Sequence, residues 1–504
     1  MKRNYLLPLF VLFTITVFYN CSKENASSLE SGLSNSADFA GDYDGNYDPT
    51  EADPASGDQY NEYEENGFVK TTDKPISTFS IDADGGAYSN TRRYLLNDKQ
   101  LPPRGAIRTE EFINYFHYDY PQATGNEPIA LNGEVSDCPW KPDHKLLRIG
   151  IRGKDIPRNQ LPNSNFVFLI DVSGSMSSDD KLGMLRESFK RFTDQMRDDD
   201  RIAIVTYAGA DKIVLESTAG SEKRKIKRAI DKLKSGGSTA GAKGIITAYE
   251  IAERNFIEGG NNRVVLGSDG DFNVGPSTQE ELVELIEAKR ESGVFLTVLG
   301  VGRGNYNEAA MEQIANNGNG TYEYLDSQEQ ADKVFIHEFN KFYTVAKDVK
   351  IQIEFNPAIV EEYRLIGYEN RLLETEDFED DTKDAGEIGS NQTITALYEY
   401  KPVSQQPRNA PSVTIDFRYK LPAENVSQPL SLEVRDQGNS FDDATESMRF
   451  AASAAGFGML LWESDYSGDL EYSDLKTWVR KARTYDPQGH RKEMEELIEV
   501  AEGL

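Results

Sequence analysis

The spacing of hydrophobic positions divides the chain into regions with different rhythms. In residues 67–160, apolar and polar residues alternate over Ser77–Asp84 and Lys145–Lys154, which predicts two half-buried strands. Between these stretches, Arg108–Phe116 places apolar residues at helical spacing, and Thr109 could cap that helix. We therefore expect residues 67–160 to form an N-terminal α+β region that contributes to a β domain.

The rhythm changes in residues 161–345, where short apolar runs alternate with amphipathic helices. A parallel sheet covered on both faces produces this pattern, because its strands are buried on both sides. One further stretch, Lys212–Ser217, follows a run closely enough to be its hairpin partner. The expected strands are Phe166–Ile170, Arg201–Gly209, Arg263–Asp271, Phe295–Gly302 and Tyr322–Leu325. The expected helices are Leu182–Met196, Glu222–Leu233, Ala242–Phe256, Gln279–Glu291, Asn307–Ala315 and Ala331–Phe342. We predict an α/β domain with a doubly wound, mostly parallel, Rossmann-like sheet.

Alternation by two returns in residues 346–437, which predicts the antiparallel strands of a β-sandwich-like domain. The earlier stretch Leu146–Ile151 could join these strands, in which case the α/β domain is an insertion into the β domain. Residues 438–504 read as helices. Within them, Met448–Trp462 is rich in small residues, which suits a core helix and is too short for a membrane span.

The first residues have the composition of an export signal. Residues 1–20 combine Lys2 and Arg3 with the apolar stretch Leu6–Phe18, and Cys21 follows directly. A cysteine at this place resembles the lipobox of bacterial lipoproteins, which implies cleavage before Cys21 and lipidation of its thiol. Residues 21–66 are polar and acidic without periodicity, so we expect a disordered tether. These features predict a lipid-anchored protein of the bacterial cell envelope, with the outer membrane as the expected location and surface exposure left open.

The net charge and the Cys and His content exclude several classes of partner and of metal site. The net charge of −30 disfavours nucleic acid and anionic lipid surfaces, so the membrane is expected to be contacted through the lipid anchor alone. Two cysteines and four scattered histidines show no zinc-ligand spacing. We interpret Cys138 as a buried, small apolar residue beside Trp140.

Oxygen-bearing side chains follow three of the predicted structural elements. Asp171, Ser173 and Ser175 come directly after one strand, Thr239 lies in the loop Gly236–Gly241, and Asp269 lies at the end of another strand. Ligands of open parallel sheets bind beyond the carboxyl ends of strands. Hard oxygen ligands with few acids suit Mg²⁺ or Mn²⁺ and leave coordination positions for water or for another molecule's carboxylate.

The stretches "FLIDVSGSM", "GGSTAGAKGI" and "VVLGSDGDFNVG" occur in that order and resemble the metal-ion-dependent adhesion site of von Willebrand factor type A (VWA) domains. The resemblance implies that the two serines bind the metal directly, that Thr239 joins when a ligand is bound, and that both aspartates act largely through water. Ser268 stands where the family usually has Thr. The flanking blocks resemble a family of bacterial VWA lipoproteins with no settled biochemical role.

We therefore predict a non-catalytic adhesion or assembly protein whose metal accepts an Asp or Glu carboxylate from an unknown partner protein. Two alternatives stay open: an envelope hydrolase or enzyme subunit, and a structural scaffold in which the metal only stabilises the domain. The enzyme is disfavoured because no nucleophile, general base and orienting group converge in the sequence.

Overall fold

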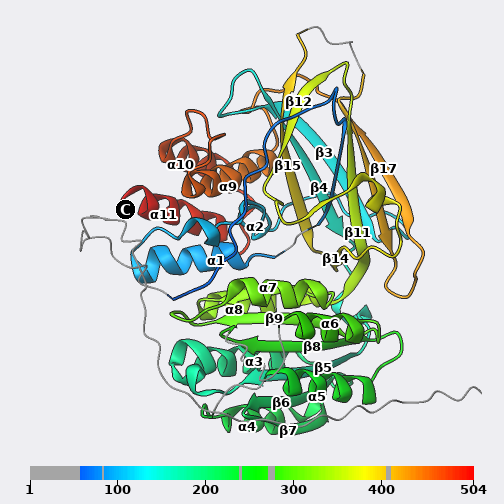
Figure 1. Ribbon diagram of the computed structural model, residues 1–504, viewed down its shortest axis with the longest axis vertical. Coiled ribbons are helices and arrows are strands. Elements are labelled where there is room, and N and C mark those ends of the chain that lie inside the picture. The colour runs from blue at the N-terminus through cyan, green and yellow to red at the C-terminus, as the bar shows by residue number, and fades with distance from the viewer. Residues whose placement is uncertain (1–56, 82–83, 238–240, 271–278, 405–409) are drawn as a thin grey trace, which may run out of the picture. The chain divides into compact units, whose positions relative to one another are not determined.

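Six strands form the sheet of the α/β domain in the order β10-β9-β8-β5-β6-β7 (Figure 1). Five of them pair in parallel, and β7 pairs antiparallel with β6 as the predicted hairpin. Their bounds are β5 (Ser164–Asp171), β6 (Arg201–Ala208), β7 (Ala210–Ala219), β8 (Asn261–Ser268), β9 (Phe295–Val301) and β10 (Tyr322–Leu325). This computed structural model describes residues 57–81, 84–237, 241–270, 279–404 and 410–504. The predicted doubly wound, mostly parallel sheet is confirmed.

Alternate residues of β5 pack against two different sets of helices. Phe166 and Phe168 join the core formed with α3, whereas Val167 and Leu169 join the core formed with α5. Phe168 stacks on Phe189 of α3 with ring centroids 4.1 Å apart. The helices are α3 (Met184–Gln195), α4 (Lys223–Asp231), α5 (Gly241–Arg254), α6 (Gln279–Arg290), α7 (Glu308–Asn317) and α8 (Gln328–Asp332). Both faces of the sheet are therefore covered, which explains the continuous apolar runs in its strands.

Two further sheets form the β-sandwich, with strand orders β1-β12-β15-β4-β3 and β13-β2-β11-β16-β17; β14 also pairs with β11. Their first strands are β1 (Val69–Lys70), β2 (Ile76–Ser80), β3 (Ile129–Asp137) and β4 (Lys145–Gly153). The others are β11 (Thr344–Phe355), β12 (Val360–Ile366), β13 (Leu372–Leu373), β14 (Gly386–Gly389), β15 (Thr393–Pro402), β16 (Val413–Lys420) and β17 (Gln428–Val434). Because β4 pairs with β15 along its length, the α/β domain is an insertion into the sandwich, as predicted.

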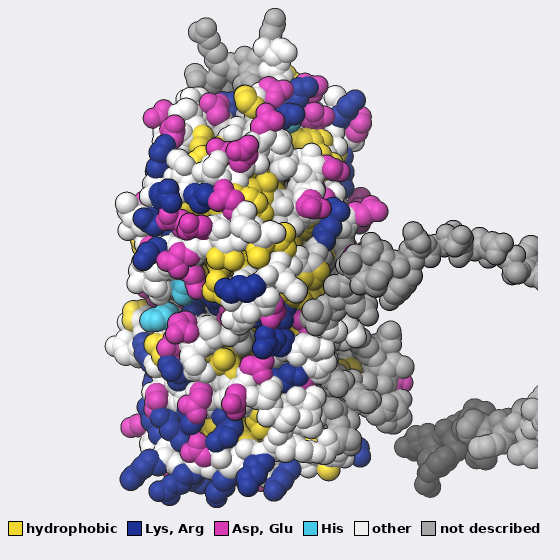
Figure 2. Space-filling view, turned by 90° about the vertical axis from the view of Figure 1, so that its left-hand side faces the viewer, with side chains coloured by type: hydrophobic (Ala, Val, Ile, Leu, Met, Phe, Trp, Pro, Cys, Tyr) yellow, Lys and Arg dark blue, Asp and Glu magenta, His cyan; other side chains and the backbone are white. Residues whose placement is uncertain are grey.

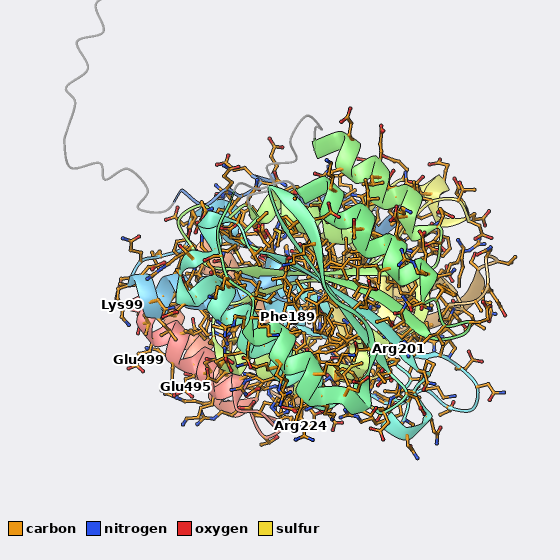
Figure 3. All side chains as sticks on the ribbon, turned by 90° about the horizontal axis from the view of Figure 1, so that it is seen from below. Lys99, Phe189, Arg201, Arg224, Glu495 and Glu499 are labelled. Carbon is orange, nitrogen blue, oxygen red and sulfur yellow. The ribbon has the colours of Figure 1, made fainter. Side chains whose placement is uncertain are left out.

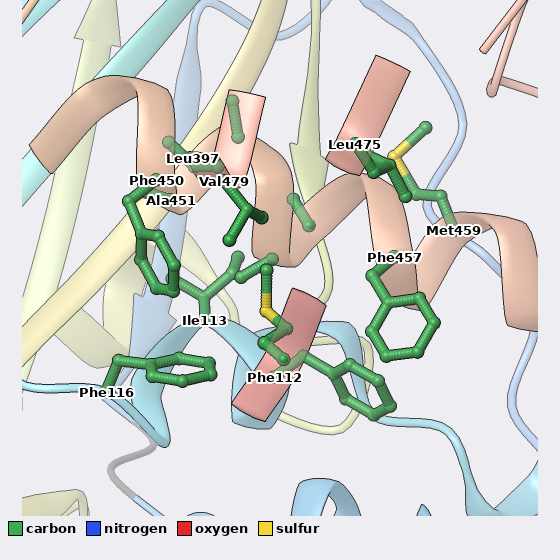
Figure 4. Close-up of a cluster of buried hydrophobic side chains, with 14 of the residues drawn as sticks. Phe112, Ile113, Phe116, Leu397, Phe450, Ala451, Phe457, Met459, Leu475 and Val479 are labelled. Carbon is green, nitrogen blue, oxygen red and sulfur yellow. The ribbon is translucent and has the colours of Figure 1, made fainter. Parts of the chain in front are cut away.

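A helical core packs beside the sandwich (Figure 4). Its long helix α9 places Phe450 4.7 Å from Phe116 and Phe457 5.8 Å from Phe112, measured between ring centroids. Cys138 and Trp140 are both buried in this core, as predicted. The helices are α1 (Gly86–Arg93), α2 (Thr109–Asn114), α9 (Glu446–Trp462), α10 (Tyr472–Lys481) and α11 (His490–Glu502). No helix in the described part of the chain is long and apolar enough to cross a membrane.

Three local predictions differ from the structure. Thr109 is not a cap: helix α2 begins at Thr109, the extended residue Arg108 precedes it, and no side chain caps it. The single helix expected at Ala331–Phe342 is divided into α8, a π-turn at Lys333–His337 and a 3₁₀ turn at Phe339–Phe342. The break lets Phe335, Phe339 and Phe342 all reach one core. Finally, residues 57–66, expected within the tether, make ordered contacts that are described below.

Lys and Arg side chains gather at the end of the molecule formed by the α/β domain (Figure 2). Helix α4 has the sequence KRKIKRAID, and its Arg224 lies exposed at the periphery in the view from this end, whereas Phe189 lies centrally (Figure 3). The negative charge of the chain is therefore unevenly distributed.

The predicted signal peptide, Cys21 and residues up to 56 lie outside the described residues.

Candidate metal site

The carboxyl ends of β5 and β8 meet where the strand order of the sheet reverses. Strands β6 and β7 continue on one side of β5, and β8, β9 and β10 continue on the other. Such a switch point leaves a crevice beyond the strand ends, where open α/β sheets bind ligands. Asp171 is the last residue of β5, and Asp269 directly follows the last residue of β8. Two of the predicted site residues are thus placed on adjacent strand ends.

The loop after β5 turns its polar groups toward one another. Asp171 Oδ1 accepts a hydrogen bond from the backbone N–H of Ser173 over 2.8 Å. The hydroxyl oxygens of Ser173 and Ser175 lie 2.9 Å apart. Asp171 and Ser173 are buried. The structure therefore brings Asp171, Ser173 and Ser175 together, as the D-x-S-x-S spacing predicts.

The glycine-rich loop before α5 is tied to this first loop through the backbone. Gly236 N–H donates to the carbonyl of Val172 over 2.7 Å, and Gly174 N–H donates to the carbonyl of Gly237 over 3.0 Å. Gly237 has a φ of +94°, a left-handed conformation that favours glycine. Thr239 itself lies outside the described residues, so its predicted role stays a prediction, but the preceding turn is held at the site.

The third loop joins the first through Ser268. The Ser268 hydroxyl donates to Asp171 Oδ2 over 3.2 Å and accepts from the backbone N–H of Gly270 over 3.1 Å. Gly270 has a φ of +83°, and a Cβ there would lie 2.8 Å from the backbone nitrogen of Asn307. Asp269 is fully buried between these residues. Ser268, which has no predicted ligand role, thus orients an aspartate of the site.

Two further residues, Lys181 and Asn305, contact Asp269. Lys181 donates to Asp269 Oδ2 over 3.0 Å, and the side-chain amide of Asn305 donates to the same oxygen over 3.2 Å. Lys181 also donates to Asn305 Oδ1. The only sequence signal for Lys181 is its position one residue before Leu182, the first residue of the predicted amphipathic helix Leu182–Met196.

The segment before β1 holds the loop that carries Asn305. Asp58 Oδ1 accepts from the backbone N–H groups of Gly304, over 2.7 Å, and Tyr306, over 3.1 Å. Asp58 Oδ2 pairs with Arg93 over 2.8 Å. Ordered packing thus begins before the predicted end of the tether at Asn66, because the Asp58 carboxylate meets both backbone donors and a buried cation. This strap, residues 57–66, therefore contacts the loop whose Asn305 donates to Asp269.

Burial and mutual repulsion make the carboxylates of the site favour a cation. Burial, with a smaller contribution from the neighbouring Asp269, raises the pKa of Asp171 to about 6, although hydrogen bonds from Ser173 and Ser268 lower it. Burial, Asp171 and Asp269 also raise the pKa of the adjacent Tyr207 well above its usual value. A bound cation would relieve both the desolvation and the repulsion of the two aspartates.

The described donors fit a hard divalent ion. They are two carboxylates and two hydroxyls, the oxygen chemistry that Mg²⁺ and Mn²⁺ prefer. The small number of acids would leave coordination positions for water or for an added carboxylate. These residues would hold such an ion, and the ion would act as the electrophile that binds an anionic oxygen.

Comparison with known proteins matches the chain in three consecutive parts. Residues 165–338 match the von Willebrand factor type A domain. Residues 54–148 match the family described as von Willebrand factor, and residues 340–504 match the family described as the C-terminal part of uncharacterized protein YfbK. The family matches therefore include the flanking regions as well as the α/β domain.

One curated relative resembles nearly the whole chain. It is the uncharacterized protein YfbK of Escherichia coli (strain K12), 41% identical over 471 residues, covering 88% of this chain and 81% of that protein. A UPF0353 protein of Mycolicibacterium gilvum is 31% identical over 159 residues, covering 29% of this chain and 46% of that protein.

Likeness to solved structures is more distant. A von Willebrand factor type A structure from Catenulispora acidiphila is 14% identical, covers 74% of this chain and 92% of its own, and has a TM-score of 0.43. Proximal thread matrix protein 1 from the mussel byssus, with a zinc-occupied MIDAS motif, is 24% identical, covers 35% of this chain and 44% of its own, and has a TM-score of 0.28. On the extent of its match to the Escherichia coli relative, this chain belongs to the YfbK family of proteins with a von Willebrand factor type A domain.

Proposed function

We propose that this protein is a non-catalytic, divalent-metal-dependent protein-binding lipoprotein of the bacterial cell envelope. Its Mg²⁺ or Mn²⁺ ion is held by Asp171, Ser173, Ser175, Thr239 and Asp269, and it accepts an Asp or Glu carboxylate from a partner protein. The proposal rests on one observation above all: the loops after β5 and β8 and the Gly236–Gly237 turn are hydrogen-bonded to one another at the switch point of the sheet.

The hydrogen-bond partners of the Ser173 and Ser175 hydroxyls favour a binding role over a catalytic one. Ser173 and Ser175 bond to each other, and within the described residues neither hydroxyl bonds to a histidine that could serve as a general base. A serine nucleophile requires such a partner for activation. A VWA domain suggests a protein-interaction role. We propose in addition that this interaction depends on the metal and that the partner supplies a carboxylate.

The lipid anchor at Cys21 and the outer-membrane location complete the proposal. A tethered receptor of this kind would display the metal at the switch-point edge, near the strap at Asp58 that follows the tether. The partner is a protein, because the net charge of −30 disfavours anionic polymers and lipid surfaces as ligands.

Crosslinking in intact cells tests the proposal directly. The full chain is compared with the Ser173→Ala/Ser175→Ala double variant, and Ser177→Ala/Ser178→Ala serves as the matched control because both of its serines are exposed in the same loop region. We expect wild type and control to yield the same crosslinked partner, and the site variant and EDTA-treated cells to lose it. An unchanged partner in the site variant would contradict the proposal.

A further inference from the structure

A lysine ammonium is built into the candidate metal site. The Lys181 side chain is 7% exposed and the Asp269 side chain is fully buried, and the ion pair between them measures 3.0 Å. Asn305 contacts both members of the pair, since it donates to Asp269 Oδ2 and accepts from Lys181. Lysines are rarely buried unless they are paired, and the partner of this one is an aspartate of the candidate metal site.

The fold makes room for the stem of Lys181. A Cβ at Gly302 would lie 2.3 Å from Lys181 Cγ and 2.4 Å from its Cε, so only glycine leaves space for the lysine to cross this turn. Gly302 also has a φ of +80°, and its carbonyl accepts from the Tyr324 hydroxyl over 2.6 Å. Packing around its stem therefore fixes the ammonium in place, unlike that of a mobile surface lysine.

The position of this charge changes the electrostatics of a metal at the site. Asp171 and Asp269 supply two negative charges, and the ammonium cancels one of them. A divalent ion bound among these groups therefore leaves an excess of one positive charge, whereas without Lys181 the sum would be zero. With Lys181 present, the bound ion attracts an incoming carboxylate more strongly. Without Lys181, the site binds the bare ion more tightly.

We propose that Lys181 is a fixed positive charge that weakens binding of the bare metal ion and strengthens the ion's hold on an external carboxylate. This inference rests on the proposed function and assigns Lys181 as a positioning and charge-setting residue of the same site. It makes metal and carboxylate binding interdependent, so the site fills most fully when a partner supplies its acid.

Mn²⁺ titration of the purified full chain, followed by electron paramagnetic resonance, tests the inference with acetate as the carboxylate probe and acetamide as its neutral match. Lys181→Met keeps the length of the stem but removes the charge, and Lys181→Arg keeps the charge. Lys190→Met is the matched control, because Lys190 of α3 pairs with two exposed acids, Glu187 of α3 and Asp231 of α4.

For wild type, Lys181→Arg and Lys190→Met, we expect acetate to tighten Mn²⁺ binding after correction for the Mn²⁺–acetate complex in solution. For Lys181→Met, we expect bare Mn²⁺ to bind on the order of tenfold to a hundredfold more tightly, with the effect of acetate reduced toward none. A lysine with a merely structural role would give the opposite sign, since its loss would weaken the site. Should Lys181→Met not fold, Lys181→Gln, which keeps a donor for Asp269, carries the same expectation.

The two hypotheses fail in distinguishable ways. Unchanged or weaker Mn²⁺ binding in folded Lys181→Met, with binding intact in wild type, overturns the role of Lys181 and leaves the metal site standing. Absence of Mn²⁺ binding in wild type overturns both.

Discussion

Ser268 Oγ lies 3.2 Å from Asp171 Oδ2 and thereby connects the end of β8 to the end of β5. The same hydroxyl accepts from Gly270 N–H, so one side chain fixes both an aspartate of the site and the turn that follows Asp269. The Ser268 side chain thus connects the two strand ends at the switch point.

Ser268→Ala should weaken Mn²⁺ binding by about tenfold, because loss of a buried hydrogen bond leaves Asp171 less well oriented. Ser268→Thr keeps the hydroxyl and should bind within a few-fold of wild type. Calorimetric titration of the three proteins measures the difference, and equal affinity of the alanine variant would show that Ser268 does not orient the site.

The strap at Asp58 should protect the loop that carries Asn305. Asp58→Asn places an amide N–H₂ group where Oδ2 or Oδ1 now accepts hydrogen bonds, so one acceptor for Arg93 or for the loop is lost. We expect hydrogen exchange of the Gly304 and Tyr306 amides to accelerate by at least tenfold, as for a segment that opens locally. Asp73→Asn, at an exposed aspartate, is the control and should leave these amides unchanged. Equal exchange in Asp58→Asn would show that the strap is dispensable.

The free energy of unfolding should fall in acid because His117 is buried. This residue borders a cavity of about 290 Å³, and its burial lowers the pKa of the imidazole from 6.5 to about 4, with Arg152, Lys333 and Arg491 contributing. The unfolded chain therefore takes up a proton before the folded one does, so the folded state loses stability as the pH falls from about 6.5 to about 4. The loss from this one group is at most about 3 kcal/mol.

Urea unfolding at pH 7 and pH 4.5 measures this effect. The free energy of unfolding of His117→Gln should depend less on pH than that of wild type, whereas His337→Gln, at an exposed histidine, should match wild type. Identical pH dependence of wild type and His117→Gln would contradict the assignment.

Counting thiols tests the lipid anchor. Cys138 is 3% exposed, and burial raises the pKa of its thiol well above the usual range, so it should not react with an aromatic disulfide reagent in the folded protein. Protein extracted from membranes should then release one equivalent per chain on unfolding, because an acylated Cys21 cannot react. Two equivalents would show an unmodified Cys21.

The sequence predicts the architecture well because buried strands and helix faces leave periodic patterns. The strand at Tyr322–Leu325 has the predicted bounds, and the switch-point aspartates are recognisable because each ends an apolar run. Lys181 escapes prediction for a physical reason. It follows the polar stretch Ser177–Asp180, which reads as solvated surface, and it is buried only because the loop after β9 passes over it.

Asp58 is missed for a similar reason. Its surroundings are acidic and lack periodicity, so composition alone indicates disorder, whereas the structure satisfies its carboxylate with Arg93 and two backbone amides from a loop about 250 residues away. Thr109 fails as a cap because Arg108, with an extended backbone, occupies the position before the helix. Contacts between distant segments, which no local pattern encodes, account for the burial of Lys181 and for the order at Asp58.

The most direct test of the central claim is a Mn²⁺ titration of the full chain by electron paramagnetic resonance. We predict one ion per chain for wild type and for the Ser177→Ala/Ser178→Ala control, and at least a hundredfold weaker binding for Ser173→Ala/Ser175→Ala, which removes the two hydroxyls that we propose as direct ligands. Equal Mn²⁺ affinity in the site variant and the control would contradict the metal site and, with it, the proposed mode of partner binding.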